Sequence, residues 1–371
     1  MERQSDSETI REAGELCTRV RAEMAKRIVG KDEIVRGILT GLIAGGHVLI
    51  EGVPGLAKTL AAKTFAEIAG LSFSRVQFTP DLLPADITGS LVYEQSSGRF
   101  VPRRGPVFAN VLLADEVNRA PAKVQSALLE AMEEGQVTIG ESSLALPEPF
   151  FVIATQNPIE HEGTYPLPEA QLDRFLIKVR AVYPSAEEEA GIVRRVGGGQ
   201  RAKVETVLGA ERIAFLRSAL EAVRVDDELA AYAVRVVRST RPRETVKGSE
   251  RVFDPGRQAQ AAQPPERPSA PRNASGGSAP RDESAYLSGQ AVRDVERWVE
   301  YGASPRASIH LFRCARALAL MEGRSYVLPE DVKAAAPEVL RHRLVLSYEA
   351  EAERIGADDV IARVLSALAL P

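Results

Sequence analysis

The first half of the chain alternates short apolar runs with longer runs of helical spacing. Five short runs have the length and composition of strands. They cover residues 47–51, 73–78, 111–115, 150–155 and 175–179. Between them, apolar residues recur at helical intervals over residues 32–43, 59–69 and 121–134. Strands that alternate with helices are typical of a parallel sheet covered on both faces, so the pattern predicts an α/β fold with a parallel five-stranded sheet between helices.

Smaller elements surround this alternation. The segments 91–93 and 99–101 flank a short polar turn, as do the segments 136–139 and 144–146, and each pair predicts a β-hairpin. A further amphipathic helix is predicted ahead of the sheet, over residues 9–28.

After Pro184 the apolar spacing is helical. Helices are predicted at residues 186–196, 210–223, 226–239, 292–300, 304–322, 329–344 and 358–370. Between about Arg241 and Ser288 the chain is rich in Pro, Gly, Ser, Gln and Arg and holds few large apolar residues. Such a segment cannot bury enough surface to offset the cost of ordering it. We therefore expect a disordered insertion at about 241–288 within a second, helical domain.

Composition and charge narrow the class of protein. The net charge of −4 gives no overall basic field that would indicate nucleic-acid binding. The two cysteines, Cys17 and Cys314, match no metal or redox spacing, and free thiols fit a reducing cytoplasm. The charged N-terminus lacks the apolar core of a secretory signal, and the most apolar region, 37–55, is too interrupted to span a bilayer. A cytoplasmic protein without a membrane span is expected.

The segment from His47 to Thr59 carries the clearest chemical signal. An apolar strand leads into a glycine-rich turn that opens a helix at Lys58-Thr59, close to the phosphate-binding pattern G-x-x-x-x-G-K-[ST]. Ala57 replaces the second glycine, which we expect to be a mild departure. Unpaired backbone N–H groups and Lys58 are suited to the β- and γ-phosphates of ATP, and the Thr59 hydroxyl to Mg²⁺. An ordinary strand–turn–helix corner is the alternative.

Polar residues follow two other predicted strands. Asp115 and Glu116 end the strand at 111–115, and Asn157 follows the strand at 150–155. Ligands of parallel α/β sheets bind beyond the carboxyl ends of the strands, where Gly52 also lies. Asp115 is placed to hold Mg²⁺ through its waters, Glu116 to polarise the attacking water as a base, and Asn157 to bind the γ-phosphate or the water. The alternatives are a helix cap for the carboxylates and an Asn-Pro turn for Asn157.

Two arginines are candidates for contact with a polyphosphate. Arg174 lies just before the strand at 175–179, and Arg306 opens a helix in the second domain. A guanidinium is planar and always charged, so it suits a polyphosphate better than an ammonium does. For each arginine, an ordinary surface ion pair is the alternative that spacing alone leaves open.

Several long segments carry a family resemblance. They are GGHVLIEGVPGLAKT, RVQFTPDLLPADITGS, RRGPVFANVLLADEVNRAP, LLEAMEEGQVTIG, FVIATQNPIEHEGTYPLPEAQLDRFL and YGASPRAS. Together they resemble the MoxR group of AAA+ ATPases, densely over 28–182 and more loosely beyond. The resemblance implies an N-terminal helix at 1–27, an AAA+ P-loop ATPase core at 28–183 and a small all-α lid at 184–371, with ATP bound between core and lid.

Residue roles follow from the resemblance by matching position. Asp115-Glu116 would be Walker B, Asn157 sensor 1, Arg174 an arginine finger that acts on a neighbour's nucleotide, and Arg306 sensor 2, through which ATP closes the lid. Thr59 and Asp115 would hold the metal. The nucleotide-binding set would be Val29, Gly30, Gly52, Val53, Pro54, Gly55, Leu56, Ala57, Lys58, Thr59, Leu60 and Asp115.

The resemblance also implies partners and a function. The family's ring, usually a hexamer, would hydrolyse ATP to remodel, activate or help assemble client proteins, often with a separate protein that carries a von Willebrand A domain. The hairpins match insertions that point toward the ring pore in related groups. Two other functions stay open: a nucleotide-dependent scaffold with little hydrolysis, and a nucleic-acid motor. The insertion at 241–288 is either a tolerated loop or a tether for a partner.

Overall fold

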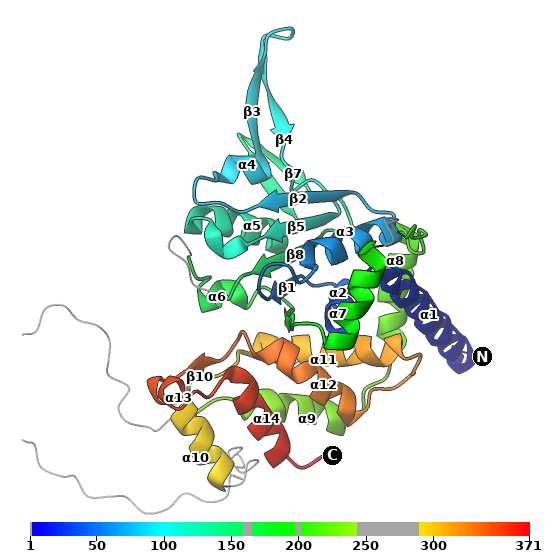
Figure 1. Cartoon of the computed structure of the whole chain (residues 1–371), viewed down its shortest axis with the longest axis vertical. Helices are drawn as coiled ribbons and strands as arrows, with labels where there is room; N and C mark the ends of the chain where they lie inside the picture. The colour runs from blue at the N-terminus through cyan, green and yellow to red at the C-terminus, as the bar shows by residue number, and fades with distance from the viewer. Residues whose placement is uncertain (1, 159–164, 198–201, 243–288) are drawn as a thin grey trace, which may run out of the picture.

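The structure is a computed structural model that describes residues 2–158, 165–197, 202–242 and 289–371 (Figure 1). The insertion predicted at about 241–288 lies outside the described residues from 243 onward. Within the described ranges, no helix is both long enough and apolar enough to cross a membrane.

A parallel sheet of five strands forms the centre of the upper part of the molecule in Figure 1. The strands are β1 (Val48–Glu51), β2 (Phe73–Gln77), β5 (Val111–Asp115), β8 (Phe151–Gln156) and β9 (Ile177–Arg180). Their order is β2-β5-β8-β1-β9, and every neighbouring pair is parallel. The predicted five-stranded parallel sheet is confirmed.

Helices cover both faces of this sheet because alternate strand residues point to opposite sides. In β5, Val111 and Leu113 join the core cluster that includes helices α1 (Glu2–Ala25), α2 (Asp32–Ile43) and α3 (Lys58–Ala69). The intervening Leu112 and Ala114 join a second cluster on the other face. That face is covered by α4 (Pro84–Thr88), the 3-10 turn η1 (Val117–Arg119) and α5 (Ala122–Glu134). Continuous apolar runs are therefore required in the central strands, as the sequence pattern indicated.

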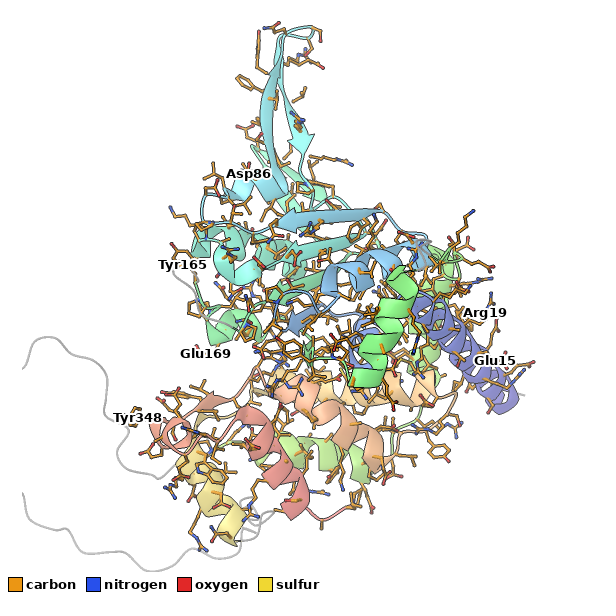
Figure 2. All side chains as sticks on the ribbon, viewed as in Figure 1. Glu15, Arg19, Asp86, Tyr165, Glu169 and Tyr348 are labelled. Carbon is orange, nitrogen blue, oxygen red and sulfur yellow. The ribbon has the colours of Figure 1, made fainter. Side chains whose placement is uncertain are left out.

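Both predicted hairpins are present. β3 (Gly89–Glu94) pairs with β4 (Arg99–Arg104), and β6 (Gln136–Ile139) pairs with β7 (Ser142–Ala145), both antiparallel. The β3–β4 hairpin is longer than predicted and projects from the top of the molecule in Figure 1. The side chains toward its tip stand away from the other elements in Figure 2.

The rest of the described chain is mostly helical. The helices are α6 (Glu169–Leu172), α7 (Ala186–Gly197), α8 (Ala210–Ala222), α9 (Asp227–Arg238), α10 (Gly289–Trp298), α11 (Pro305–Met321), α12 (Pro329–Leu340), α13 (Tyr348–Ala352) and α14 (Ala357–Ala367). A small antiparallel pair joins β10 (Val299–Tyr301) to β11 (Val345–Leu346). β10 replaces the end of the helix predicted at 292–300, and α12 ends at Leu340, before the predicted end at 344.

Helix α8 lies against the sheet domain rather than with the lower helices. Arg217 donates a hydrogen bond of 3.1 Å to the carbonyl of Leu42 in α2, and the Val207 N–H, just before α8, donates one of 2.9 Å to Ile68 in α3. Helices α9 to α14 gather below the sheet in Figure 1. The domain boundaries proposed from the sequence, at 27 and 183, stay a prediction.

Candidate active site

The loop from Gly52 to Ala57 joins the carboxyl end of β1 to the first turn of α3. A Cβ on Gly52 would lie 2.8 Å from the Ala181 Cβ, so this position needs glycine for close packing. Gly55 has φ +88°, a conformation that side chains rarely adopt. Pro54 is exposed, whereas Leu56 is buried and Leu60 packs against the core. The loop is thus fixed at its base and open at its tip.

Ala57 departs from the expected pattern more than the sequence suggested. Its φ of 58° and ψ of 18° are left-handed, the region in which the glycine of the usual pattern carries no steric cost. A non-glycine residue there costs about 1–2 kcal/mol. Glu116, with φ 58° and ψ 52°, is left-handed as well. Strained residues of this kind cluster at functional sites, and here two of them lie at the same edge of the sheet.

Lys58 is buried and turns back over the loop. Its ammonium donates to the carbonyl of Gly52. Burial lowers the pKa of Lys58, while the nearby carboxylates of Asp115, Glu116 and Glu51 act in the opposite direction. A buried ammonium gains strongly from an anionic partner, since little water remains to solvate it. Phosphate oxygens at the loop would provide that partner.

Asp115, the last residue of β5, is the centre of a hydrogen-bond cluster whose other members come from β2, β8 and α3. Its Oδ1 accepts from the Thr155 hydroxyl at 2.6 Å. Its Oδ2 accepts from the Thr59 hydroxyl at 3.1 Å and from two nitrogens of Arg75 at 2.7 and 3.0 Å. Burial favours the neutral carboxyl, but the hydrogen bonds from Thr155, Arg75 and Thr59 outweigh it and lower the pKa of Asp115. Asp115 is therefore ionised at neutral pH.

The donor set beside Asp115 fits a magnesium ion. Mg²⁺ is usually held through one or two carboxylates and substrate phosphates, with several waters retained. The Thr59 hydroxyl and the Asp115 carboxylate lie 3.1 Å apart at the start of α3. The guanidinium of Arg75 already balances the charge of the same Asp115 oxygen. Thr59 and Asp115 are therefore suitable ligands, directly or through water.

Glu116 is held by both its backbone and its side chain. The backbone N–H donates to the Thr155 hydroxyl at 2.8 Å. The carboxylate accepts from Gln77 at 3.1 Å and from Arg119 at 3.0 Å. The Thr155 hydroxyl therefore links the Asp115 carboxylate to the backbone of Glu116, the two residues predicted as the Walker B pair. This fixed position suits a general base, which has to stay within hydrogen-bond reach of the water it activates.

The end of β8 lies beside the phosphate loop. The Gly52 N–H donates to the Gln156 carbonyl at 3.1 Å, which places Asn157 next to the base of the loop. Asn157 is anchored in turn, because its carbonyl accepts from the Asn118 side chain at 3.1 Å. Gly52, Asp115, Glu116 and Asn157 therefore meet at one edge of the sheet, as the sequence predicted.

Val29 and Gly30 lie against α7. A side chain on Gly30, whose φ is +61°, would collide with the Glu188 carboxylate, and a Cβ on Gly191 would contact Val29 at 3.6 Å. The contact brings α7 against two residues of the nucleotide-binding set that the resemblance implies.

Arg174 and Arg306 lie together at the other edge of the sheet. Arg174 precedes β9, whereas the phosphate loop follows the opposite end of β1, and four-residue strands separate these edges by about 13 Å. Glu133 contacts Arg174 at 3.1 Å and Arg306 at 3.6 Å. Arg306 therefore does not lie at the phosphate loop of its own subunit, and lid closure on that nucleotide through Arg306 is not the arrangement observed.

Three residues at these sites were missed in the sequence. Thr155 is a fully buried hydroxyl inside the apolar run FVIAT, which was a usable signal. Arg75 is brought to Asp115 only by the neighbouring position of β2 and β5. Glu133 meets Arg174 through the packing of the sheet domain and meets Arg306 through the docking of α11. Neither juxtaposition follows from spacing along the chain.

Comparisons with known proteins identify the family. A family model described as "ATPase family associated with various cellular activities (AAA)" matches residues 47–177, and one described as "AAA lid domain" matches residues 293–364. The chain is 46% identical to Chaperone MoxR1 of Mycobacterium tuberculosis over 361 residues, which are 97% of this chain and 84% of that protein. This chain belongs to the MoxR family of AAA+ ATPases.

Other MoxR relatives and a solved structure extend the match. Protein MoxR of Methylorubrum extorquens is 30% identical over 367 residues, covering 95% of this chain and 94% of that protein. A crystal structure from Cytophaga hutchinsonii, described as that of a "putative ATPase", matches with a TM-score of 0.82 and 39% identity. The match covers 100% of this chain and 99% of that chain. The resemblance and the α/β AAA+ fold with a helical lid are confirmed.

Proposed function

We propose that this MoxR-family chain binds ATP and Mg²⁺ at Gly52–Thr59 and Asp115, and hydrolyses the ATP in a ring of identical subunits. The observation that carries the proposal is the cluster in which the Thr155 hydroxyl bonds both Asp115 and Glu116 beside the phosphate loop. The products of hydrolysis are ADP and phosphate. The energy released serves to remodel, activate or help assemble client proteins.

Each residue at the loop has a separate task. Lys58 and the N–H groups of the loop hold the β- and γ-phosphates, and Thr59 and Asp115 hold the metal. A bound Mg²⁺ would supply positive charge that offsets the negative charge developing on the phosphates. Glu116 accepts a proton from the attacking water through its carboxylate, which Gln77 and Arg119 orient. Asn157 orients that water or the γ-phosphate.

Arg174 and Arg306 act on the nucleotide of a neighbouring subunit. Their guanidinium groups are both partly exposed, with 33% and 47% of the side chain accessible. Because they lie at the edge of the sheet opposite the phosphate loop, they are directed toward another copy rather than toward their own site. A ring is the assembly in which every site receives such arginines, and rings are general among AAA+ proteins. A hexamer and a cytoplasmic location are our expectation.

The β3–β4 hairpin is suited to contact a client. Tyr93 and Phe100 pair across the strands with ring centroids 5.4 Å apart, yet remain 53% and 67% exposed. Exposed apolar surface of this kind marks interaction sites. The hairpin belongs to this chain, whereas the von Willebrand A domain partner that we propose is a separate protein.

The proposal is tested by phosphate release with Glu116→Gln. We expect turnover to fall at least about 100-fold, because a general base contributes about 10²–10⁴ to the rate. ATP binding should persist in this variant and should be lost in Lys58→Ala. Glu141→Gln, in the exposed turn of the second hairpin, is the control and should release phosphate like the unaltered chain.

The outcomes separate the competing functions. Turnover in Glu116→Gln equal to that of the unaltered chain would remove Glu116 as the base. An unaltered chain that binds ATP but releases no phosphate would support the scaffold. Salt-sensitive, ATP-dependent binding of DNA would support the nucleic-acid motor.

A further inference from the structure

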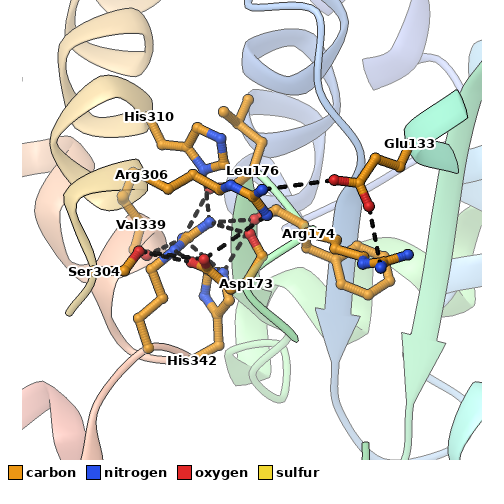
Figure 3. A network of polar contacts seen from close by, with 11 residues as sticks. Glu133, Asp173, Arg174, Leu176, Ser304, Arg306, His310, Val339 and His342 are labelled. Carbon is orange, nitrogen blue, oxygen red and sulfur yellow. Dashed lines mark hydrogen bonds and ion pairs between the residues drawn. The ribbon is translucent and has the colours of Figure 1, made fainter. Parts of the chain in front are cut away.

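A small polar cavity of about 140 Å³ lies between the sheet domain and the start of α11. Six residues line it: His47, Met132, Glu133, Arg174, Arg306 and His310. Figure 3 shows Glu133 reaching from the end of α5 toward both guanidinium groups. The cavity is therefore where the two arginines of the proposed neighbour-facing edge meet one carboxylate.

The charges in this cavity are unequal. Two guanidinium groups face the carboxylate of Glu133 at 3.1 and 3.6 Å. Arg306 also lies 3.9 Å from the Asp173 carboxylate, whose charge is balanced by Arg343 at 2.6 Å. Both histidines are neutral, because burial lowers the pKa of His47 to about 4 and that of His310 to about 3. The cavity thus has an excess positive charge, which matches a small dianion such as a phosphate group.

The segment that carries Arg174 is fixed to the lid. Arg343, whose side chain is 1% exposed, donates to the Asp173 carboxylate at 2.6 Å and to the Phe175 carbonyl at 2.5 Å. It also contacts His310 and His342, which accept as neutral rings at 2.6 and 2.7 Å. Arg343 therefore holds the residues on both sides of Arg174.

The Glu133 side chain is less tightly held than the segment that carries Arg174. It stands in the last turn of α5, and 42% of its side chain is exposed. An ion pair that is half exposed contributes little, so it can be exchanged at low cost for a better-charged partner. When a competing anion arrives, we expect the carboxylate to leave while the two arginines keep their places.

We propose that Glu133 occupies, in the free subunit, the place that a phosphate of a neighbouring copy takes in the assembled ring. Glu133 keeps Arg174 and Arg306 side by side and also competes with the incoming phosphate. It is a positioning residue that sets the concentration at which subunits assemble on nucleotide. This inference rests on the proposed function, since it requires the arginines to face a neighbour's nucleotide.

The test is self-assembly of the full chain with Mg²⁺ and a non-hydrolysable ATP analogue, followed by sedimentation velocity. Glu133→Gln keeps the shape of the side chain and removes its charge. We expect its midpoint protein concentration for assembly to fall about two- to fivefold, the range given by releasing two half-exposed ion pairs. Glu134→Gln, the exposed next residue of α5, is the matched control, and Glu133→Asp should remain within about twofold of the unaltered chain.

Three results would decide the matter. A lowered midpoint in Glu133→Gln alone, with thermal unfolding of the nucleotide-free chain unchanged, supports the proposal. An unchanged or raised midpoint overturns it. If a raised midpoint comes with a lower thermal stability of the nucleotide-free chain, Glu133 has a merely structural role. If the unaltered chain fails to assemble on nucleotide, the ring itself is refuted together with this inference.

Discussion

Thr155→Val removes one hydroxyl from the centre of the candidate active site and keeps the shape of the side chain. Thr155 is 0% exposed. Its hydroxyl donates to Asp115 at 2.6 Å and accepts from the Glu116 N–H at 2.8 Å. Valine can do neither, so the substitution leaves an ionised carboxylate with fewer donors and a backbone N–H without its acceptor.

The magnitude follows from these two contacts. A hydrogen bond to a charged group contributes about 1.5–3 kcal/mol, and a buried donor left unpaired costs about 1–3 kcal/mol. The additional buried methyl group of valine offsets about 1 kcal/mol. We therefore expect Thr155→Val to lower the free energy of unfolding by about 3 kcal/mol. Thr155→Ser keeps the hydroxyl, loses one methyl group and should cost about 1 kcal/mol.

Urea denaturation followed by circular dichroism measures the difference. The pH dependence of the free energy of unfolding provides a second test of the same contacts. A carboxyl whose pKa is lowered in the folded state stabilises the fold above its unfolded pKa, and this contribution is lost as the pH falls through the folded value. The gap between Thr155→Val and Thr155→Ser should therefore be widest near pH 7 and narrow below about pH 4. A valine variant as stable as the serine variant at pH 7 would refute the reasoning.

Two further predictions concern the loop and the histidines. Ala57→Gly should leave the free energy of unfolding unchanged or raise it by up to about 1 kcal/mol. The reason is that relief of left-handed strain balances or outweighs the added entropy of the unfolded chain. A clear loss of stability in urea denaturation would contradict this prediction. His47 and His310 are held neutral with pKa values of about 4 and 3, so the unfolded chain binds more protons below pH 6.5 and stability should fall from there toward pH 4. A flat stability profile between pH 6.5 and 4.5 would argue against both neutral histidines.

The sheet and the phosphate loop were predictable because their signals are local. Continuous apolar runs mark strands buried on both faces, and the turn before Lys58 is defined within eight residues. Asp115 and Glu116 were found by the same means, since they end such a run. The prediction of one shared edge needed only the rule that parallel strands end together.

The positions of Arg174 and Arg306 were only partly predictable because they depend on how the lid docks on the sheet domain. Arg174 and Arg306 are far apart along the chain, and no local pattern indicates that both contact Glu133. The position of Arg306 depends on Arg343, which ties the lid to residues 173–176. The left-handed conformation of Ala57 was missed for another reason, since alanine itself gives no signal for it.

Helix α5 would couple the hydrolysis site of one subunit to its contact with the neighbouring subunit in a ring. It starts shortly after Glu116 and reaches Glu133 at its last turn, and its 13 residues contain no glycine or proline at which it would bend. At 1.5 Å per residue, it connects points about 20 Å apart without a joint. A shift at one end therefore moves the other end, so in a ring a movement beside Glu116 would change how readily Glu133 gives up Arg174 and Arg306 to the phosphate of the neighbouring subunit.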